Sequence, residues 1–260
     1  MVTEYDHICW GGGVHHHGGH TLSVSGLSVR YREVEALRDI TFSTHCGHTV
    51  ALMGPNGAGK STLIHAMAGL IRTQAGSMQW NGQDLRQTSH EIAFVPQRST
   101  VDWQFPITVR HLVEMGRYPN LGQWKKVSEH DHHIVSKAIK TLKLTDLQHR
   151  RIGELSGGQQ QRAFLARALA QEAHILLLDE PFTGLDVPGM ESLGKQLREL
   201  AAEGRLIIAS HHNLNNAADL FDQTLLLNKT RIAFGATRDV LTAENIFRAF
   251  GFHHTPGIQA

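Results

Sequence analysis

The sequence is poor in cysteine, has no long apolar run and carries almost no net charge. Cys9 and Cys46 are its two cysteines, too few for a disulfide framework, which favours a reducing compartment. Residues 1–20 lack the apolar segment of a secretory signal, and no apolar run reaches the length that spans a bilayer. The 25 Lys and Arg nearly balance the 24 Asp and Glu, which disfavours nucleic-acid binding driven by bulk charge. Any role at a membrane would therefore require docking to a separate membrane protein.

Residues 1–20 differ in composition from the rest of the chain. They are rich in Gly and His, offer little to bury, and are expected to form a flexible extension. The segment holds several potential ligands for a transition metal: His7, Cys9, His15, His16, His17 and His20. Two interpretations remain open, a solvated tail that binds metal weakly and a regulatory metal sensor.

From residue 21 onward the pattern is that of an α/β fold. Residues 22–31 alternate apolar and polar side chains like a half-buried strand, and residues 49–53 form a short apolar run like a buried one. Residues 175–178 and 206–209 are further apolar runs of the kind found in central parallel strands. Strands that alternate with amphipathic helices predict a mostly parallel sheet covered on both faces.

Two regions depart from this alternation. Residues 99–157 contain apolar side chains at helical spacing, with Ser128 and Asp131 placed to cap a helix, and predict a small helical insert. Near the end, residues 224–227 and 231–234 flank a tight turn and predict a hairpin. Residues 236–260 are expected to form a helical tail that follows the main domain of residues 21–235.

The first chemical motif matches the phosphate-binding pattern G-x-x-x-x-G-K-[ST] in full. It lies between the buried strand at 49–53 and an amphipathic helix, so that backbone N–H groups and the helix N-terminus can meet phosphates. Within it, Lys60 would reach the terminal phosphates of a nucleotide and the Ser61 hydroxyl would bind Mg²⁺. The motif comprises Gly54, Pro55, Asn56, Gly57, Ala58, Gly59, Lys60, Ser61 and Thr62.

The second motif is an apolar strand that ends in two acids, Asp179 and Glu180. A carboxylate at the end of a buried strand loses hydration, so packing alone does not account for it. We expect Asp179 to hold the metal and Glu180 to polarise the attacking water of a hydrolysis.

The third motif, Leu155-Ser156-Gly157-Gly158-Gln159, precedes a long helical stretch. A Ser-Gly-Gly turn at a helix start is a second potential anion site. This motif resembles the LSGGQ signature of the ABC transporter ATPases, and the resemblance covers about residues 21–235. It implies a P-loop NTPase (RecA-like) core with an antiparallel β subdomain and an inserted helical subdomain. It also implies a head-to-tail dimer in which the signature residues Ser156, Gly157, Gly158 and Gln159 of one subunit close over ATP held by the other.

The remaining family motifs can be placed by the same resemblance. Tyr31 matches the aromatic residue that stacks on adenine, although a tyrosine packed in the core is the alternative. Gln97 matches the glutamine that senses Mg²⁺ and the attacking water, and Asp186 matches the loop that communicates across the dimer, with a simple helix cap as the alternative. His212 matches the switch histidine that contacts the γ-phosphate, with His211 as the alternative. Asn213 stands where the family usually has an acid, which puts carboxylate tuning of that histidine in question.

The segment after Gln97 resembles the manganese, zinc and iron uptake ATPases, in which it faces the permease. It contains Trp103, Phe105 and Pro106, then residues 115–118. These side chains would suit a docking patch, or they would anchor the helical insert to the core. Manganese is the first expected cargo and zinc the second, with an iron-chelate importer or an ABC ATPase of iron–sulphur assembly as alternatives.

The resemblance also implies the assembly. The chain is expected to use ATP and Mg²⁺, to form a homodimer at the cytoplasmic face of the inner membrane, and to bind integral-membrane permease subunits. An extracytoplasmic metal-binding protein would complete the system, and nucleic acid is not an expected partner.

Overall fold

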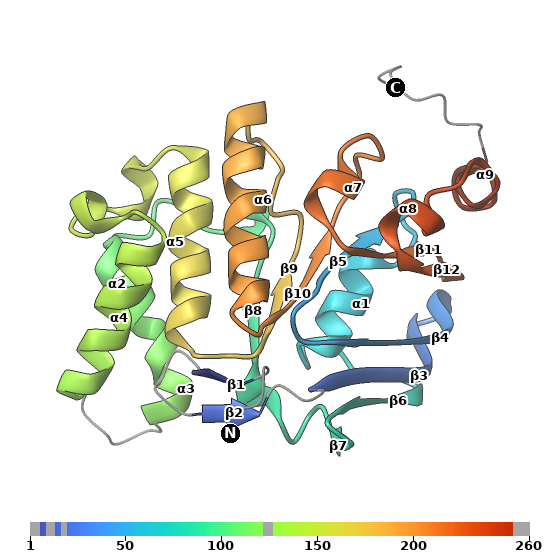
Figure 1. The fold of residues 1–260 in the computed structure, drawn as a ribbon, viewed down its shortest axis with the longest axis horizontal. Helices are drawn as coiled ribbons and strands as arrows, with labels where there is room; N and C mark the ends of the chain where they lie inside the picture. The colour runs from blue at the N-terminus through green and yellow to red at the C-terminus, as the bar shows by residue number, and fades with distance from the viewer. Residues whose placement is uncertain (1–5, 9–13, 17–19, 122–126, 252–260) are drawn as a thin grey trace.

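The computed structural model describes residues 6–8, 14–16, 20–121 and 127–251 of the chain. These residues form a central six-stranded sheet, a second sheet of four strands and a group of helices at one side (Figure 1). Within the described residues, no helix combines the length and the apolar character needed to cross a membrane.

The central sheet carries the strands predicted as buried. Its spatial order is β12-β11-β5-β10-β9-β8, and every neighbouring pair is parallel except β11 with β12, which form the predicted hairpin. The bounds are β5 Thr49–Met53, β8 Ile92–Val95, β9 Ile175–Leu178, β10 Leu206–Ser210, β11 Gln223–Asn228 and β12 Thr230–Ala236. The P-loop strand β5 therefore lies inside the sheet, between β10 and β11.

Successive side chains of the central strands pack alternately into two separate apolar cores, one on each face of the sheet. In β5, Ala51 and Met53 belong to one core, whereas Val50 and Leu52 belong to the other. The same alternation holds along β9, and each strand is buried on both faces because helices cover one side and further strands cover the other. This two-sided burial explains why the sequence shows short, continuous apolar runs there.

One face of the central sheet is covered by α5 (Gly157–Ala170) and α6 (Val187–Ala202) (Figure 1). The opposite face packs against α1 (Lys60–Met67) and the four-stranded antiparallel sheet, whose order is β4-β3-β6-β7. That sheet comprises β3 Thr21–Tyr31, β4 Val34–His45, β6 Ala75–Trp80 and β7 Gln83–Asp84. The alternating pattern of residues 22–31 thus corresponds to β3, which buries every second side chain over most of its length.

The helical insert contains α2 (Val109–Glu114), α3 (Tyr118–Leu121) and α4 (Glu129–Thr141), of which α2 and α4 pack with α5. The predicted cap is present, because Ser128 and Asp131 form a reciprocal capping box at the start of α4. Short 3-10 turns join the elements at Ser89–Glu91, Arg98–Thr100, Met115–Arg117, Thr145–Leu147 and Ile152–Glu154.

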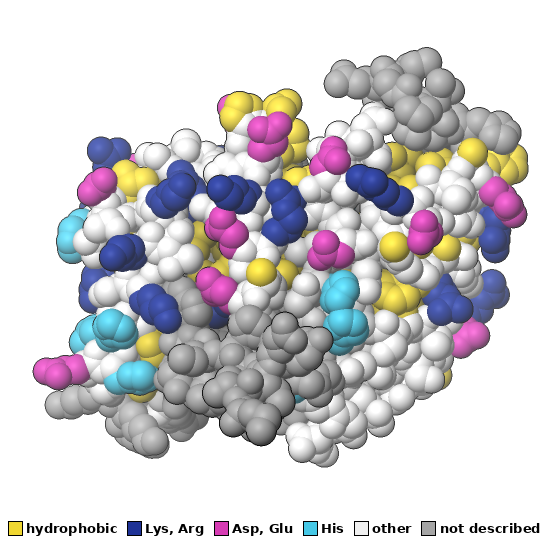
Figure 2. All heavy atoms as spheres, in the orientation of Figure 1, with side chains coloured by type: hydrophobic (Ala, Val, Ile, Leu, Met, Phe, Trp, Pro, Cys, Tyr) yellow, Lys and Arg dark blue, Asp and Glu magenta, His cyan; other side chains and the backbone are white. Residues whose placement is uncertain are grey.

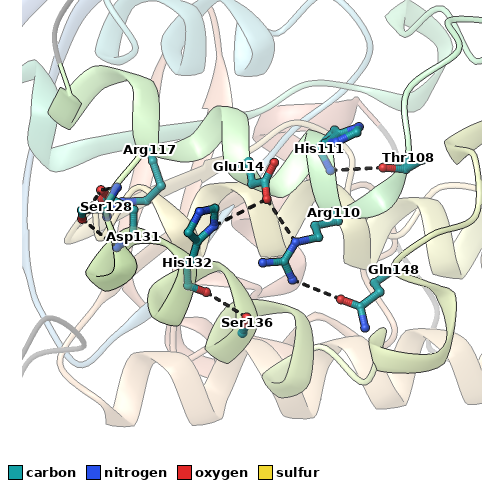
Figure 3. A network of polar contacts seen from close by, with 10 residues as sticks. All are labelled: Thr108, Arg110, His111, Glu114, Arg117, Ser128, Asp131, His132, Ser136 and Gln148. Carbon is teal, nitrogen blue, oxygen red and sulfur yellow. Dashed lines mark hydrogen bonds and ion pairs between the residues drawn. The ribbon is translucent and has the colours of Figure 1, made fainter. Parts of the chain in front are cut away.

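A buried cation holds the helical insert together (Figure 3). The Arg117 guanidinium is 4% exposed and donates to the Asp131 carboxylate over 2.9 Å, to Glu172 over 2.6 Å and to the Ala170 carbonyl over 2.7 Å. Burial raises the pKa of Asp131, but hydrogen bonds from Ser128 and Arg117 outweigh it and lower this pKa to about 2. Arg117 thereby ties the start of α4 to the end of α5.

A second polar chain in the insert is more exposed (Figure 3). The Glu114 carboxylate accepts from Arg110 Nε at 3.1 Å and lies 3.9 Å from His132 Nδ1. Arg110 also donates to the Gln148 side chain at 3.2 Å. These contacts join α2, α4 and the segment before α5.

The two ends of the chain carry short elements. Residues Asp6–Ile8 (β1) and Val14–His16 (β2) pair as an antiparallel ribbon, which the sequence does not predict, and the rest of 1–19 lies outside the described residues. The flexibility of this extension and its role as a metal sensor remain predictions. At the other end, α8 (Thr237–Val240) and α9 (Ala243–Phe250) follow the last strand, whereas α7 (Ala217–Leu220) lies between β10 and β11, and residues 252–260 lie outside the described part.

Candidate nucleotide-binding site

The P-loop leaves the buried end of β5 and turns directly into α1. Gly59 precedes the helix with a φ of 99°, and a Cβ there would lie 2.3 Å from the Leu37 side chain. Only glycine therefore fits this turn. No side chain caps α1, so the N–H groups of its first turn remain available to phosphate oxygens.

Lys60 lies over this loop. Its ammonium donates to the carbonyls of Gly54 over 2.8 Å and Pro55 over 2.9 Å. Burial lowers the pKa of Lys60, although the nearby carboxylates of Glu180 and Asp179 oppose that effect. The arrangement places one cation between the P-loop and the two acids, as binding of a terminal phosphate requires.

Asp179 follows β9 and connects the start of α1 to the end of β10. It is 4% exposed, and its Oδ1 accepts from the Ser61 hydroxyl at 3.1 Å and from the Ser210 hydroxyl at 2.7 Å. A hydroxyl beside one carboxylate offers hard oxygen donors, which fit Mg²⁺ held jointly with substrate phosphates. Within the described residues no cluster of three or more His, Cys, Asp or Glu could hold a metal, so nothing there competes as a protein-only metal cage.

Glu180 is fixed from several directions. Its Oε2 accepts from Gln97 Nε2 at 2.7 Å and from the Thr183 hydroxyl at 3.1 Å, while its backbone N–H donates to Ser210 Oγ at 2.6 Å. Its φ of 48° lies in the left-handed region, which is strained for a residue with a side chain. Gln97 and Glu180, which the sequence predicts separately as site residues, are thus in direct contact, and the carboxylate has a defined orientation.

The signature turn stands at the start of α5. Ser156 caps the helix by accepting from the Gln159 N–H, and the Gln159 side chain accepts from the Ser156 N–H at 2.9 Å. Gly157 faces the Arg98 guanidinium, because a Cβ there would lie 2.9 Å from Arg98 Nη1. The turn thus contacts the segment that follows Gln97.

Tyr31 and Asp186 are two further predicted site residues, and their roles in adenine stacking and in contact between subunits stay predictions. Tyr31 is 46% exposed at the end of β3, so its ring is accessible for stacking. Asp186 caps α6 by accepting from the Gly189 N–H at 3.1 Å, which is the helix-cap alternative. That cap leaves its proposed role across a dimer untested.

The two adjacent histidines have different environments. His211 is 3% exposed, its Nε2 lies 2.7 Å from Asn216 Oδ1, and its ring packs against Phe182 and Phe221. Burial lowers the pKa of His211, and the contact with Asn216 opposes this effect. His212 is exposed. Geometry therefore favours His212 over His211 as the residue that can reach a nucleotide.

The predicted permease-facing segment divides into two kinds of residue. Phe105, Met115 and Tyr118 are 57%, 41% and 57% exposed. Trp103, by contrast, is half-buried, packs edge-on against Phe164 and donates from Nε1 to the Arg98 carbonyl at 3.0 Å. Trp103 thus anchors the segment to α5, and a docking role for the exposed side chains stays a prediction.

Ser210 is a site residue that sequence reasoning missed. It ends β10, which lies between β5 and β9, and its hydroxyl touches both Asp179 and the Glu180 N–H. The available signal was its position immediately before the two histidines, at the end of a predicted parallel strand. Carboxyl ends of neighbouring parallel strands share one edge of a sheet, so the end of this strand was expected to lie near the acids.

Three features together define an ATP-hydrolysing cassette: a P-loop after β5, two acids directly after β9, which β10 separates from β5, and a signature turn at the start of α5. The chain belongs to the ABC transporter family, whose model matches residues 37–183, more than half of the sequence. It is an ATP-binding, ATP-hydrolysing subunit, and that role implies a membrane permease partner.

Individual relatives agree with this family. The chain is 44% identical over 229 residues to a Chlamydia trachomatis protein named "Probable metal transport system ATP-binding protein", with 88% of each chain covered. It is 41% identical to the manganese transport system ATP-binding protein MntB of Halalkalibacterium halodurans, covering 88% of this chain and 91% of the relative. Among solved structures, an inward-facing ABC transporter described as of the metal-chelate type matches with a TM-score of 0.80 and 31% identity, covering 91% and 90%.

Proposed function

We propose that this chain energises a manganese importer, working as a homodimer beneath permease subunits at the cytoplasmic face of the membrane. The observation that carries the proposal is the group of Lys60, Asp179, Glu180 and Gln97 beside the P-loop, here called the hydrolytic corner, in which Gln97 holds the Glu180 carboxylate. The chain that contains it is 41% identical to a protein named for manganese transport. Relatives of similar identity in Bacillus subtilis and Listeria innocua carry the same manganese name.

In this proposal the P-loop binds the phosphates of ATP. Backbone N–H groups of residues 54–59 and of the first turn of α1 surround the phosphate oxygens. Lys60, which already lies between the loop carbonyls and the acids, exchanges its contacts with Gly54 and Pro55 for the terminal phosphates. The exposed ring of Tyr31 stacks on adenine.

Glu180 orients and polarises the attacking water, and Gln97 fixes the carboxylate for that task. Ser61, Asp179 and Gln97 are the residues that would hold Mg²⁺. When bound, Mg²⁺ neutralises charge on the phosphates. His212, exposed at the end of β10, contacts the γ-phosphate.

Each site is completed by the second subunit. Ser156, Gly157, Gly158 and Gln159 at the start of α5 close over the nucleotide bound by the partner, and Asp186 communicates across the dimer. Closure by ATP and opening after hydrolysis drive the permease between its two states. No covalent intermediate with the protein is needed.

The surface around Phe105, Met115 and Tyr118 is proposed to receive the permease, because exposed large apolar side chains favour burial against a partner. On the face shown in Figure 2, basic and acidic side chains are interspersed, which does not favour a nucleic-acid partner. An extracytoplasmic metal-binding protein would deliver the cargo to the permease.

The test is uptake of labelled manganese, with zinc and iron in parallel, in cells that carry the native chain or Lys60→Ala. Lys195→Ala is a matched control, since that side chain is 74% exposed. Loss of manganese uptake, but not of zinc or iron uptake, in cells with Lys60→Ala and not in cells with Lys195→Ala would support the proposal. Loss of zinc or iron uptake instead would change the cargo, and normal uptake of all three would contradict metal import.

A further inference from the structure

Arg98 lies where three functional segments meet. Its Nε donates to the Gln160 side chain over 2.9 Å, one residue beyond the signature motif. A Cβ built on Gly157 would lie 2.9 Å from Arg98 Nη1, and one built on Gly184, in the loop before Asp186, would lie 3.6 Å away. One guanidinium therefore lies beside both the signature turn and the loop that leads to α6.

The Gln160 side chain that receives this bond is itself held. It is 4% exposed, and its Nε2 donates to the Ile152 carbonyl at 3.1 Å. Bonded at both ends, this buried amide joins the Arg98 guanidinium to the Ile152 carbonyl. The bond thus ties the first turn of α5 to the segment that follows Gln97.

The backbone of Arg98 connects to the permease-facing segment. Its carbonyl accepts from Trp103 Nε1 at 3.0 Å, and its guanidinium lies 5.8 Å from the centre of the Trp103 ring. The Trp103 ring packs edge-on against Phe164 of α5. Movement of the segment that carries exposed Phe105 would therefore displace both Arg98 and α5.

The residue before Arg98 is Gln97, whose amide binds the Glu180 carboxylate. Two consecutive side chains thus serve two different nucleotides. Gln97 acts at the site of its own subunit, whereas Arg98 supports the signature that closes on the nucleotide of the other subunit. This division depends on the proposed function, since it requires the dimer.

We propose that Arg98 is a positioning residue that fixes the signature turn relative to Gln97. The residues that act on the subunit's own nucleotide and those that close over the partner's nucleotide are thereby ordered together. Arg98 does not contact the P-loop, and its removal leaves nucleotide binding by a single subunit intact. What it sets is the orientation of Ser156, Gly157 and α5, and hence the affinity with which two ATP-loaded subunits close.

The experiment measures ATP-dependent dimerisation by analytical ultracentrifugation in a Glu180→Gln background, where hydrolysis is blocked. Arg98→Met keeps the aliphatic stem and removes the charge and the donors. Arg98→Lys keeps the charge but concentrates the donors on a single nitrogen. Arg72→Met alters an exposed arginine as a control. Binding of a fluorescent ATP analogue to the dilute single subunit is measured in parallel.

Arg98→Met is expected to weaken dimerisation by about tenfold, the order of a lost hydrogen bond to a charged group, while the analogue binds the single subunit as before. Arg98→Lys should recover part of that loss, and Arg72→Met should show none. Adding Gln160→Leu to Arg98→Met should give little further loss, because the two side chains form one interaction.

Equal dimerisation of Arg98→Met and its parent would overturn the inference. A matching loss of analogue binding by the single subunit would do so as well, since it would mark a general structural defect. If the Glu180→Gln parent itself forms no ATP-dependent dimer, the proposed function fails and the inference fails with it.

Discussion

The hydrolytic corner and the helical insert use the same charged residue types in different ways. At the edge of the central sheet, Asp179 and Glu180 are held by hydroxyl and amide donors. In the insert, Asp131 and Glu172 are bound by the buried guanidinium of Arg117. Neutral donors leave a carboxylate free to engage a metal or water, whereas a buried cation neutralises it and fixes helices. Position in the fold, rather than residue type, separates catalytic charge from structural charge.

The largest expected effect is on the catalytic side of this comparison. Glu180→Gln should lower ATP hydrolysis by about 10³-fold, within the range for loss of a general base, while the chain still folds and binds ATP because Gln97 and Thr183 can bond the new amide oxygen. Phosphate release and ATP affinity are the measurements. Glu199→Gln, at a side chain 60% exposed, is the control. Retained hydrolysis in Glu180→Gln would remove this carboxylate from the mechanism.

Arg117→Met tests the structural side. It leaves Asp131 and Glu172 without their shared cation in a buried site, and we expect the free energy of unfolding to fall by about 3–5 kcal/mol. Arg38→Met, which removes an ion pair whose arginine is 65% exposed, should cost less than about 1 kcal/mol. Urea unfolding compares the two. Similar losses for both variants would contradict the structural role of Arg117.

The adjacent residues His211 and His212 allow a structural and a catalytic side chain to be compared within one dipeptide. His212→Ala should lower hydrolysis by about 10²-fold with little change in stability, because its side chain is exposed. His211→Ala should lower the free energy of unfolding by about 2 kcal/mol, since it empties a space between Phe182 and Phe221. Steady-state ATPase rates and urea unfolding would be measured for both. The reverse pattern would make His211 the switch residue.

The smallest effect concerns pH. Because the folded pKa of Asp131 is lowered from 3.8 to about 2, its contribution to stability is complete above the unfolded pKa and disappears as pH falls through the folded one. The difference in free energy of unfolding between the native chain and Asp131→Asn should therefore be largest near about pH 5 and shrink toward about pH 2. A constant difference across this window would show that Asp131 stays protonated or unpaired.

The sequence predicts the parts of the site that adjacent residues encode. The P-loop, the Asp179–Glu180 pair and the signature each depend on a local pattern, and the structure places them on the expected elements. The capping box of Ser128 and Asp131 is equally local and is confirmed. The alternating residues of β3 and the apolar runs of β5, β9 and β10 predict strands because burial on one or two faces leaves that period in the sequence.

The rest depends on contacts between distant segments. Ser210 reaches Asp179 across 31 residues, Arg98 reaches Gln160 across 62, and Arg117 reaches the Ala170 carbonyl across 53. Arg117 lies in a segment that resembles a permease-facing string, yet its side chain is buried, because only the packing of α4 against α5 decides which way it points. The ribbon of β1 and β2 has no clear sequence signal either.

The strand order also has a consequence for synthesis on the ribosome. The P-loop strand β5 ends at Met53, but its two neighbours in the sheet are β10 and β11, which end at Ser210 and Asn228. A parallel strand cannot be stabilised before its neighbours exist, so most of the chain must emerge before β5 is flanked on both sides. The first motif to be translated is thus among the last to be fixed, and a nascent chain that ends before Gln223 lacks one of the two strands that flank β5.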